Sequence, residues 1–289
     1  PGSDMRCEEN TVVPRPPASL CSRPRPRRSL TKLKRLRDSV STVLSNSSDL
    51  AGSHYWNNND GYGTTNVDTS LATSNGGTLG TLGTADVVDN GTLAFNLSSS
   101  YALTNAISGT GSLSMLGAGV VTVSGANAYS GQTSVAAGTL WFANSGALYG
   151  GDSSKWIASN ISVAANATLS LSIGGSGEFT TTDFQTIYTN LNSALGGLSS
   201  GARLGVDTTN ASVDVQFATN FANTNAGANA FGLSKSGNGS LVLSGANTYS
   251  GPTTVLGGTL KAGSAGAFSP LSAFTLANAT GVVLDLNGF

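Results

Sequence analysis

From about residue 46 onward, short apolar runs alternate with turns rich in glycine and asparagine. Within several runs, apolar and small polar side chains alternate, as a strand buried on one face requires. The pattern therefore predicts many short β-strands joined by turns. The strand-like runs are Thr92–Phe95, Val120–Ser124, Thr139–Phe142, Ala167–Ser172, Ser240–Ser244, Thr259–Ala262 and Val282–Leu286.

An internal repeat organises these runs. Residues 117–140 (GAGVVTVSGANAYSGQTSVAAGTL) and 237–260 (GNGSLVLSGANTYSGPTTVLGGTL) align without gaps at an offset of 120, with 14 of 24 positions identical. A weaker copy of the end of the motif is Val88–Leu93 (VDNGTL), which matches Val135–Leu140. One unit of strand, turn and strand is therefore used repeatedly. The structural repeat positions that we select are Gly117, Gly119, Gly125, Asn127, Tyr129, Gly131, Thr133, Val135, Gly138, Leu140, Gly237, Gly239, Gly245, Asn247, Tyr249, Gly251, Thr253, Val255, Gly258 and Leu260.

Each unit has about two short strands and cannot bury its apolar face alone, so stacking of units predicts a continuous interior. Roughly 20–25 residues per coil would give about ten to twelve coils. We expect Asn127 and Asn247 to bond turn backbones and neighbouring coils. We expect Tyr129 and Tyr249 to pack over a corner with the hydroxyl outward. The predicted interior residues are Val121, Val123, Val135, Leu140, Phe142, Leu241, Leu243, Val255 and Leu260.

One segment, Thr180–Leu195, breaks the strand pattern. Its apolar residues follow helical spacing, Thr180 and Asp183 have the spacing of a capping box, and Gly196-Gly197 is a stop signal. We therefore expect a short amphipathic helix over about 180–195, inserted between coils with its apolar face on the solenoid flank. The apolar positions are Phe184, Ile187, Tyr188, Leu191 and Leu195.

Charge divides the chain into two parts. Residues 1–40 hold ten of the 14 Lys and Arg and four of the 15 acids, a net charge of 10 − 4 = +6, and the rest carries 4 − 11 = −7. We therefore predict a basic tail rich in Pro and Arg over 1–45, disordered, and a body over 46–289. Binding of the tail to nucleic acid or to an anionic membrane surface is the alternative. Of these two partners nucleic acid is less favoured, because no aromatic residue lies between the basic side chains to stack on bases.

Composition favours an all-β protein. Charged residues make up only 10% of the chain, and it contains 38 glycines, so a helix bundle and a coiled coil are disfavoured. Both cysteines, Cys7 and Cys21, lie in the predicted tail, so neither a disulfide nor a thiolate metal site supports the body.

The segment GSLVLSGANTYSGPTTVLGGTL, with Leu233 and Lys235 just before it, closely resembles the autotransporter-associated β-strand repeat of bacterial autotransporter passenger domains. Residues 117–140 and Asp89–Leu113 match the same repeat. The resemblance implies a right-handed parallel β-helix, secreted by the type V route to the outside of the bacterial outer membrane.

This resemblance also implies a structural or surface-display function, as a stalk or adhesin. The implied partners are a host or environmental surface glycan or protein, with the outer-membrane translocator barrel outside this fragment. We expect loops such as Ser53–Thr65 and Ser145–Ser154 to be exposed for contact.

Candidate chemistry is sparse, and we predict no catalytic, cofactor or metal site. His54 is the only histidine, and no G-x-S-x-G motif supports a triad with Asp49 or Asp60. Asn57–Gly63 lacks the carboxylate spacing of a calcium loop.

An exported carbohydrate-active enzyme, a lyase or hydrolase, is the alternative function, because parallel β-helices host such enzymes. It requires carboxylates converging on a groove. The candidates are Asp207 and Asp214 with Arg203, or Glu178 with Asp183.

Overall fold

The structure is a computed structural model that describes residues 56–57, 65–67, 71–72, 82, 84–193 and 196–289. The predicted tail, His54, Asp49 and Asp60 lie outside the described residues, as does most of the predicted loop 53–65.

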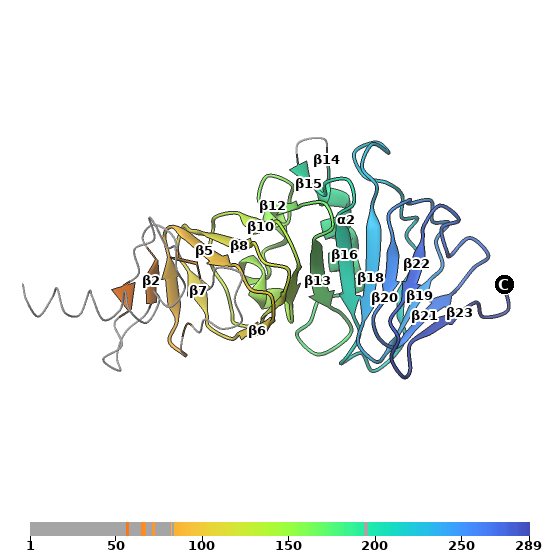
Figure 1. The fold of residues 1–289 in the computed structure, drawn as a ribbon, viewed down its shortest axis with the longest axis horizontal. Coiled ribbons are helices and arrows are strands. Elements are labelled where there is room, and N and C mark those ends of the chain that lie inside the picture. Colours follow the sequence, from red (N-terminus) through yellow and green to blue (C-terminus); the bar gives the residue numbers. More distant parts are fainter. Residues whose placement is uncertain (1–55, 58–64, 68–70, 73–81, 83, 194–195) are drawn as a thin grey trace, which may run out of the picture. The chain divides into compact units, whose positions relative to one another are not determined.

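The body is built from parallel sheets in which each strand pairs with strands of neighbouring coils (Figure 1). An eight-stranded sheet and a five-stranded sheet are parallel throughout. The eight-stranded sheet contains β6 (Ser100–Leu103), β9 (Val120–Val123), β11 (Thr139–Phe142), β13 (Thr168–Ser172), β16 (Arg203–Asp207), β18 (Gly232–Ser236), β20 (Thr253–Val255) and β22 (Phe274–Leu276). The five-stranded sheet contains β3 (Leu71–Ala72), β5 (Thr92–Phe95), β8 (Ser112–Met115), β10 (Thr133–Val135) and β12 (Ile161–Val163).

Two four-stranded sheets complete the coils. The N-terminal one contains β1 (Trp56–Asn57), β2 (Thr65–Val67), β4 (Val87–Asp89) and β7 (Ile107–Ser108), of which only β1 is antiparallel to its neighbour. The C-terminal one contains β17 (Val215–Phe217), β19 (Ser240–Leu243), β21 (Thr259–Ala262) and β23 (Val283–Asp285). Along the chain, β7 follows β6 of the eight-stranded sheet, and every strand of the C-terminal sheet also follows a strand of the eight-stranded sheet, so the two sheets occupy the same position around the coil. The predicted all-β parallel solenoid is confirmed.

Coil length varies along the solenoid. In the eight-stranded sheet Val120 pairs with Thr139, 19 residues later, and Leu233 pairs with Thr253, 20 residues later. Between these regular coils, Thr168 pairs with Arg203, 35 residues later. The longer central coils accommodate the 3₁₀ turns η1 (Ser145–Ala147), η2 (Tyr149–Gly151) and η3 (Ser153–Lys155) and the helix α2 (Thr181–Leu191).

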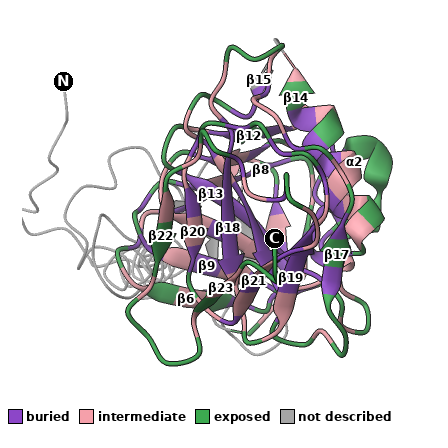
Figure 2. Ribbon diagram, turned by 90° about the vertical axis from the view of Figure 1, so that its right-hand side faces the viewer, coloured by how far each residue is buried: buried purple, intermediate pink, exposed green. Residues whose placement is uncertain are grey.

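Apolar side chains fill the inside of the coils. All nine predicted interior residues are fully buried, so this prediction is confirmed. Figure 2 shows the buried residues on the strands and the exposed residues of α2 facing outward. Burial of these side chains from one coil to the next supplies most of the stability of such a stack.

Helix α2 forms as predicted, with a complete capping box. The Asp183 backbone N–H donates to Thr180 Oγ1 at 3.1 Å, and the Thr180 N–H donates to Asp183 Oδ2 at 2.8 Å. Its apolar face packs on the flank, with the ring of Phe184 4.8 Å from that of Phe217. The helix ends at Leu191, before the predicted 195, because Asn192–Ser193 (β14) pairs antiparallel with Gly196–Gly197 (β15).

Candidate functional site

The two copies of the repeat occupy different faces of the solenoid. In the first copy β9 and β11 lie in the eight-stranded sheet and β10 in the five-stranded sheet. In the second copy the corresponding β19 and β21 lie in the C-terminal four-stranded sheet, and β20 lies in the eight-stranded sheet. The second copy is therefore moved around the coil by one face.

An asparagine in each copy joins three successive coils. The Asn127 carboxamide accepts from the Ile107 N–H at 2.8 Å and donates to the Ala147 carbonyl at 2.8 Å. Asn247 accepts from the Phe221 N–H at 2.7 Å and donates to the Ala267 carbonyl. Both side chains are buried, so they satisfy backbone groups that water cannot reach.

The repeat tyrosines point inward, and the expectation of an outward hydroxyl is wrong. Tyr129 and Tyr249 are 2% and 0% exposed. Each hydroxyl lies 2.7 Å from the hydroxyl of a threonine four residues later, Thr133 or Thr253. The phenol ring fills the space under the corner and the threonine satisfies its hydroxyl, so no outward position is needed.

The repeat glycines lie where neighbouring backbones approach closely. A Cβ at Gly125 would lie 1.9 Å from the Asn105 carbonyl oxygen, and one at Gly245 would lie 2.0 Å from that of Thr219. Gly138 and Gly258 have φ of +56° and +61°, which only glycine adopts readily. A Cβ at any of the remaining repeat glycines would also contact the preceding coil: Gly117, Gly119, Gly131, Gly237, Gly239 and Gly251. The other repeat positions, Val135, Leu140, Val255 and Leu260, are core residues.

A buried lysine distinguishes the second copy. Lys235 is fully buried, and its ammonium donates to the carbonyls of Ser236, Gly237 and Gly257 at 2.7, 2.9 and 2.9 Å. Burial lowers the pKa of Lys235 to about 8, and the negative charge of Asp207 opposes the shift. The corresponding residue of the first copy is Met115, also buried.

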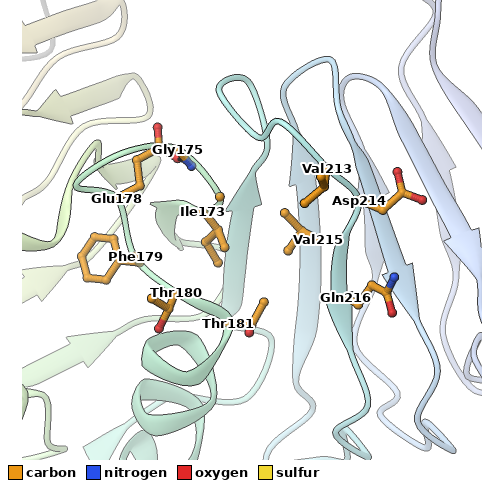
Figure 3. Close-up of a pocket in the computed structure, with 11 residues that line it drawn as sticks. Ile173, Gly175, Glu178, Phe179, Thr180, Thr181, Val213, Asp214, Val215 and Gln216 are labelled. Carbon is orange, nitrogen blue, oxygen red and sulfur yellow. Dashed lines mark hydrogen bonds between the residues drawn. The ribbon is translucent and has the colours of Figure 1, made fainter.

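One shallow hollow of about 500 Å³ lies beside α2 (Figure 3). One wall comes from Ile173–Thr181, between β13 and α2, and the other from Val213–Gln216 at β17. Figure 3 shows Ile173 on one side and Val213 and Val215 on the other. The hollow therefore has an apolar floor, with Glu178 in one wall and Asp214 in the other, where the Asp214 carboxylate points away from Ile173 (Figure 3).

The carboxylates considered for catalysis take part in structural hydrogen bonds or lie free on the surface. Glu178 accepts from the Gly175 N–H and from Asn210 Nδ2, each at 2.8 Å, and Asp183 caps α2. Asp214 is exposed to solvent.

Asp207 and Arg203 lie at the two ends of β16. Asp207 is buried and accepts from the Thr209 N–H and Ser236 Oγ. The Arg203 guanidinium donates to the Asn166 carbonyl at 3.0 Å. Only Glu178 and Asp214 of the candidates therefore share a hollow.

Asp89 is the most perturbed acid among the described residues. It is 1% exposed, and its Oδ2 has no hydrogen-bond partner. Burial raises its pKa from 3.8 to about 6, although the backbone N–H groups of Gly91 and Leu93 favour the charged form. Such a group destabilises the fold at neutral pH.

The predicted exposure of Ser145–Ser154 is only partly correct. Ala147, Leu148 and Tyr149 are buried, and the exposed part is 150–155. The Tyr149 hydroxyl lies 3.0 Å from the Gly131 carbonyl oxygen and 2.9 Å from that of Asn160 and shares its one hydrogen between them, so this segment packs into the coil. Sequence patterns missed this because the 3₁₀ turns have no strand or helix period.

The described residues contain no group of three or more His, Cys, Asp or Glu side chains close enough to hold a metal ion. No described helix has the length and apolar character needed to span a bilayer.

Repeated parallel coils joined by the same asparagine and tyrosine corner define the chain as a solenoid repeat protein. The passenger-associated-transport-repeat family model matches residues 113–141 and 233–262, which contain the two corners. The chain is 36% identical over 212 residues to the adhesin BmaC autotransporter of Brucella suis biovar 1 (strain 1330). That alignment covers 72% of this chain and spans 6% of the length of the relative. No solved structure matches the chain.

Proposed function

We propose that the chain is a surface-display passenger segment of an autotransporter, acting as a stalk and adhesive surface. Its location is the bacterial cell surface, in association with the outer membrane. The observation that carries the proposal is the pair of corners, at Asn127 and Asn247, within segments that match the passenger repeat. The similarity to an adhesin supports the same function.

The way the repeat uses its side chains supports a scaffold. The asparagine, tyrosine and threonine of each corner bond to other coils or to one another inside the body. These polar groups are therefore used for stacking, and recognition falls to the outer surface and the non-repeated loops. A solenoid of this kind holds such loops at fixed positions.

The proposed partners are glycans or proteins on host or environmental surfaces, and a translocator barrel elsewhere in the full protein. We also propose that 1–45 is a separate basic tail and 46–289 the folded body. Limited proteolysis is expected to remove the tail and leave the body intact. Loss of salt-sensitive polyanion binding after deletion of 1–45 would instead assign that binding to the tail.

We propose a non-enzymatic function. The hydrogen bonds of Asp207, Glu178 and Asp183 to backbone and side-chain donors support this proposal. The check is an assay for reducing-sugar release from bacterial and host polysaccharides. Release that disappears in Asp207→Asn, with folding unchanged, would establish the carbohydrate-active alternative.

The display function can be tested on intact cells that produce the natural full-length protein. An antibody raised against residues 84–289 is expected to label intact cells, and external protease is expected to remove the signal. Deletion of this segment is expected to reduce adhesion to host cells or matrix. A signal that appears only after cell lysis would contradict display.

A further inference from the structure

Strand β17 ends its sheet beside the hollow. Among the described residues its only strand partner is β19, and α2 packs against its C-terminal end through the Phe184–Phe217 ring contact. The end at Val213–Gln216 instead lines the hollow. Edge strands with free backbone groups are templates for an added strand.

The hydrogen-bond pattern of β17 indicates which groups are free. The Ser244 N–H of the neighbouring coil donates to the Phe217 carbonyl at 2.8 Å. Because alternate residues of a parallel strand bond to opposite neighbours, Val215 and Phe217 bond toward β19, and Gln216 directs its N–H and C=O toward the open edge. Within the described part of the chain, Val213 and Asp214 form no hydrogen bond.

The side chains around this edge suit a particular kind of strand. Val213 is 75% exposed, a large value for an apolar residue, and it lies across the hollow from Ile173 (Figure 3). Glu178 and Asp214 add negative charge, and no lysine or arginine lines the hollow. In an extended peptide, every second side chain would lie against the apolar floor. The side chains in between would point the other way, where basic ones could pair with the carboxylates.

We propose that this hollow binds an extended segment of a partner protein, with alternating apolar and basic residues, that adds as a parallel or antiparallel strand to β17. The inference rests on the proposed display function, because it names a protein as the ligand of the displayed surface. Main-chain hydrogen bonds to Gln216 would supply affinity, and the apolar floor and carboxylates would supply selectivity.

The test measures binding of a fluorescent octapeptide of alternating valine and lysine to the full 289-residue chain by anisotropy. An octapeptide of alternating valine and glutamate is the charge control, and we expect it to bind about tenfold more weakly or worse. Gln216→Pro removes the free N–H without removing a bond to β19, so it is expected to abolish binding. Gln216→Thr keeps the N–H and is the matched control, with affinity expected within about twofold of the original chain.

A second pair of variants tests charge without touching the backbone. Asp214→Lys is expected to weaken valine–lysine binding about tenfold, whereas Asp86→Lys, which changes an exposed acid outside the hollow, is expected to leave it unchanged. Circular dichroism checks the fold of each variant. If Gln216→Pro is unfolded, the Asp214→Lys and Asp86→Lys pair decides.

Three outcomes would overturn the inference. The first is that both peptides bind with equal affinity. The second is that the valine–lysine peptide still binds to both the Gln216→Pro and the Asp214→Lys variants. The third is that the chain binds neutral glycans and no peptide, and that Asp214→Lys abolishes the glycan binding. The failure of surface labelling on intact cells would contradict display and leave the peptide result standing. The failure of peptide binding alone would leave display standing.

Discussion

The first and second copies of the repeat lie on different pairs of faces yet form the same bonds. The first joins the five-stranded sheet to the eight-stranded sheet at 135–139, and the second joins the eight-stranded sheet to the C-terminal four-stranded sheet at 255–259. The asparagine bonds and the tyrosine–threonine pair recur in both. The motif therefore encodes a corner between adjoining faces, and it can serve at more than one corner.

The weaker copy extends this comparison. Val88–Leu93 runs from β4 to β5, and so turns from the N-terminal four-stranded sheet to the five-stranded sheet. The G-T-L tripeptides at 91–93, 138–140 and 258–260 thus serve at three different steps around the coil. A corner motif constrains only its immediate neighbours, so the length of the chain between copies decides which faces they join.

Differences between the copies are local replacements around a shared core. Thr133 bonds the Tyr149 hydroxyl at 2.9 Å, and Thr253 bonds the Ser272 hydroxyl at 2.8 Å. The second hydroxyl partner of the threonine is therefore a tyrosine in the first copy and a serine in the second. Met115 is replaced by Lys235. The larger tyrosine belongs to the coil with 3₁₀ turns, where it also packs 4.8 Å from the ring of Tyr129.

The strongest way to break both corners is to enlarge their central glycines. Gly125→Ala and Gly245→Ala each place a Cβ about 2 Å from a backbone carbonyl oxygen of the previous coil, so each is expected to cost about 4 kcal/mol. Urea unfolding measures the loss. Gly146→Ala, where the nearest atom is a side-chain oxygen at 3.3 Å, is the control. A loss at only one of the two corners would contradict their equivalence.

Titration of Lys235 distinguishes the second copy from the first. Its pKa is about 8 in the folded chain against 10.5 ordinarily, so between these values the unfolded state binds more protons and stability rises with pH. The rise is expected to be about 3 kcal/mol between pH 8 and 10.5. Lys235→Met, which restores the residue of the first copy, is expected to flatten it, and the exposed Lys155→Met is expected not to. Identical profiles for the three proteins would refute this assignment.

An opposite titration marks the region before the first copy. The pKa of Asp89 is raised from 3.8 to about 6 by burial, so the folded state binds more protons between these values and stability falls as pH rises from about 4 to 6. The fall is expected to be about 3 kcal/mol. Unfolding of Asp89→Asn across this range is expected to lack that component, whereas the exposed Asp86→Asn is expected to retain it.

The asparagine bonds are expected to be equal in the two copies. Asn127→Ala and Asn247→Ala each leave one buried N–H and one carbonyl without a partner, so each is expected to cost about 2 to 3 kcal/mol. Asn144→Ala, which removes a half-buried side chain that bonds one carbonyl, serves as the control with a smaller loss. Denaturant midpoints give the comparison, and losses no larger than that of the control would disprove the coil-joining role.

Removal of one phenolic hydroxyl is expected to have the smallest effect. Tyr129→Phe and Tyr249→Phe keep the ring and lose the bond to Thr133 or Thr253. Because each threonine keeps a second hydroxyl partner, the expected cost is about 1 kcal/mol in both copies. Thermal unfolding of the two variants would sharpen the comparison, and a large loss in one alone would show that its replacement partner is inadequate.

Local patterns in the sequence predicted the interior and the helix. Alternation identified Val121 and Leu241 as core residues, and helical spacing identified Phe184 and Leu191. The inward tyrosine hydroxyl was not predictable because its partner, Thr133 or Thr253, is equally typical of an exposed strand position. Composition alone does not distinguish those two environments.

The hollow and the change of face were beyond local patterns. Ile173 and Val213 belong to segments 40 residues apart, and both segments lack the repeat. Their meeting depends on how the 35-residue coil folds around α2, which neither period nor propensity specifies. The bonds of Lys235 likewise depend on the Gly257 carbonyl, which only stacking brings near.

The one-face advance between the copies has a consequence for anything that grips the molecule from outside. Two equal motifs on the same face would offer a bivalent antibody or receptor two identical binding sites on one side. Here the two copies of the same short sequence lie on different faces of the solenoid. A bivalent binder that approaches one face therefore cannot contact both copies of the motif in the same way, and it gains no avidity from the repeat.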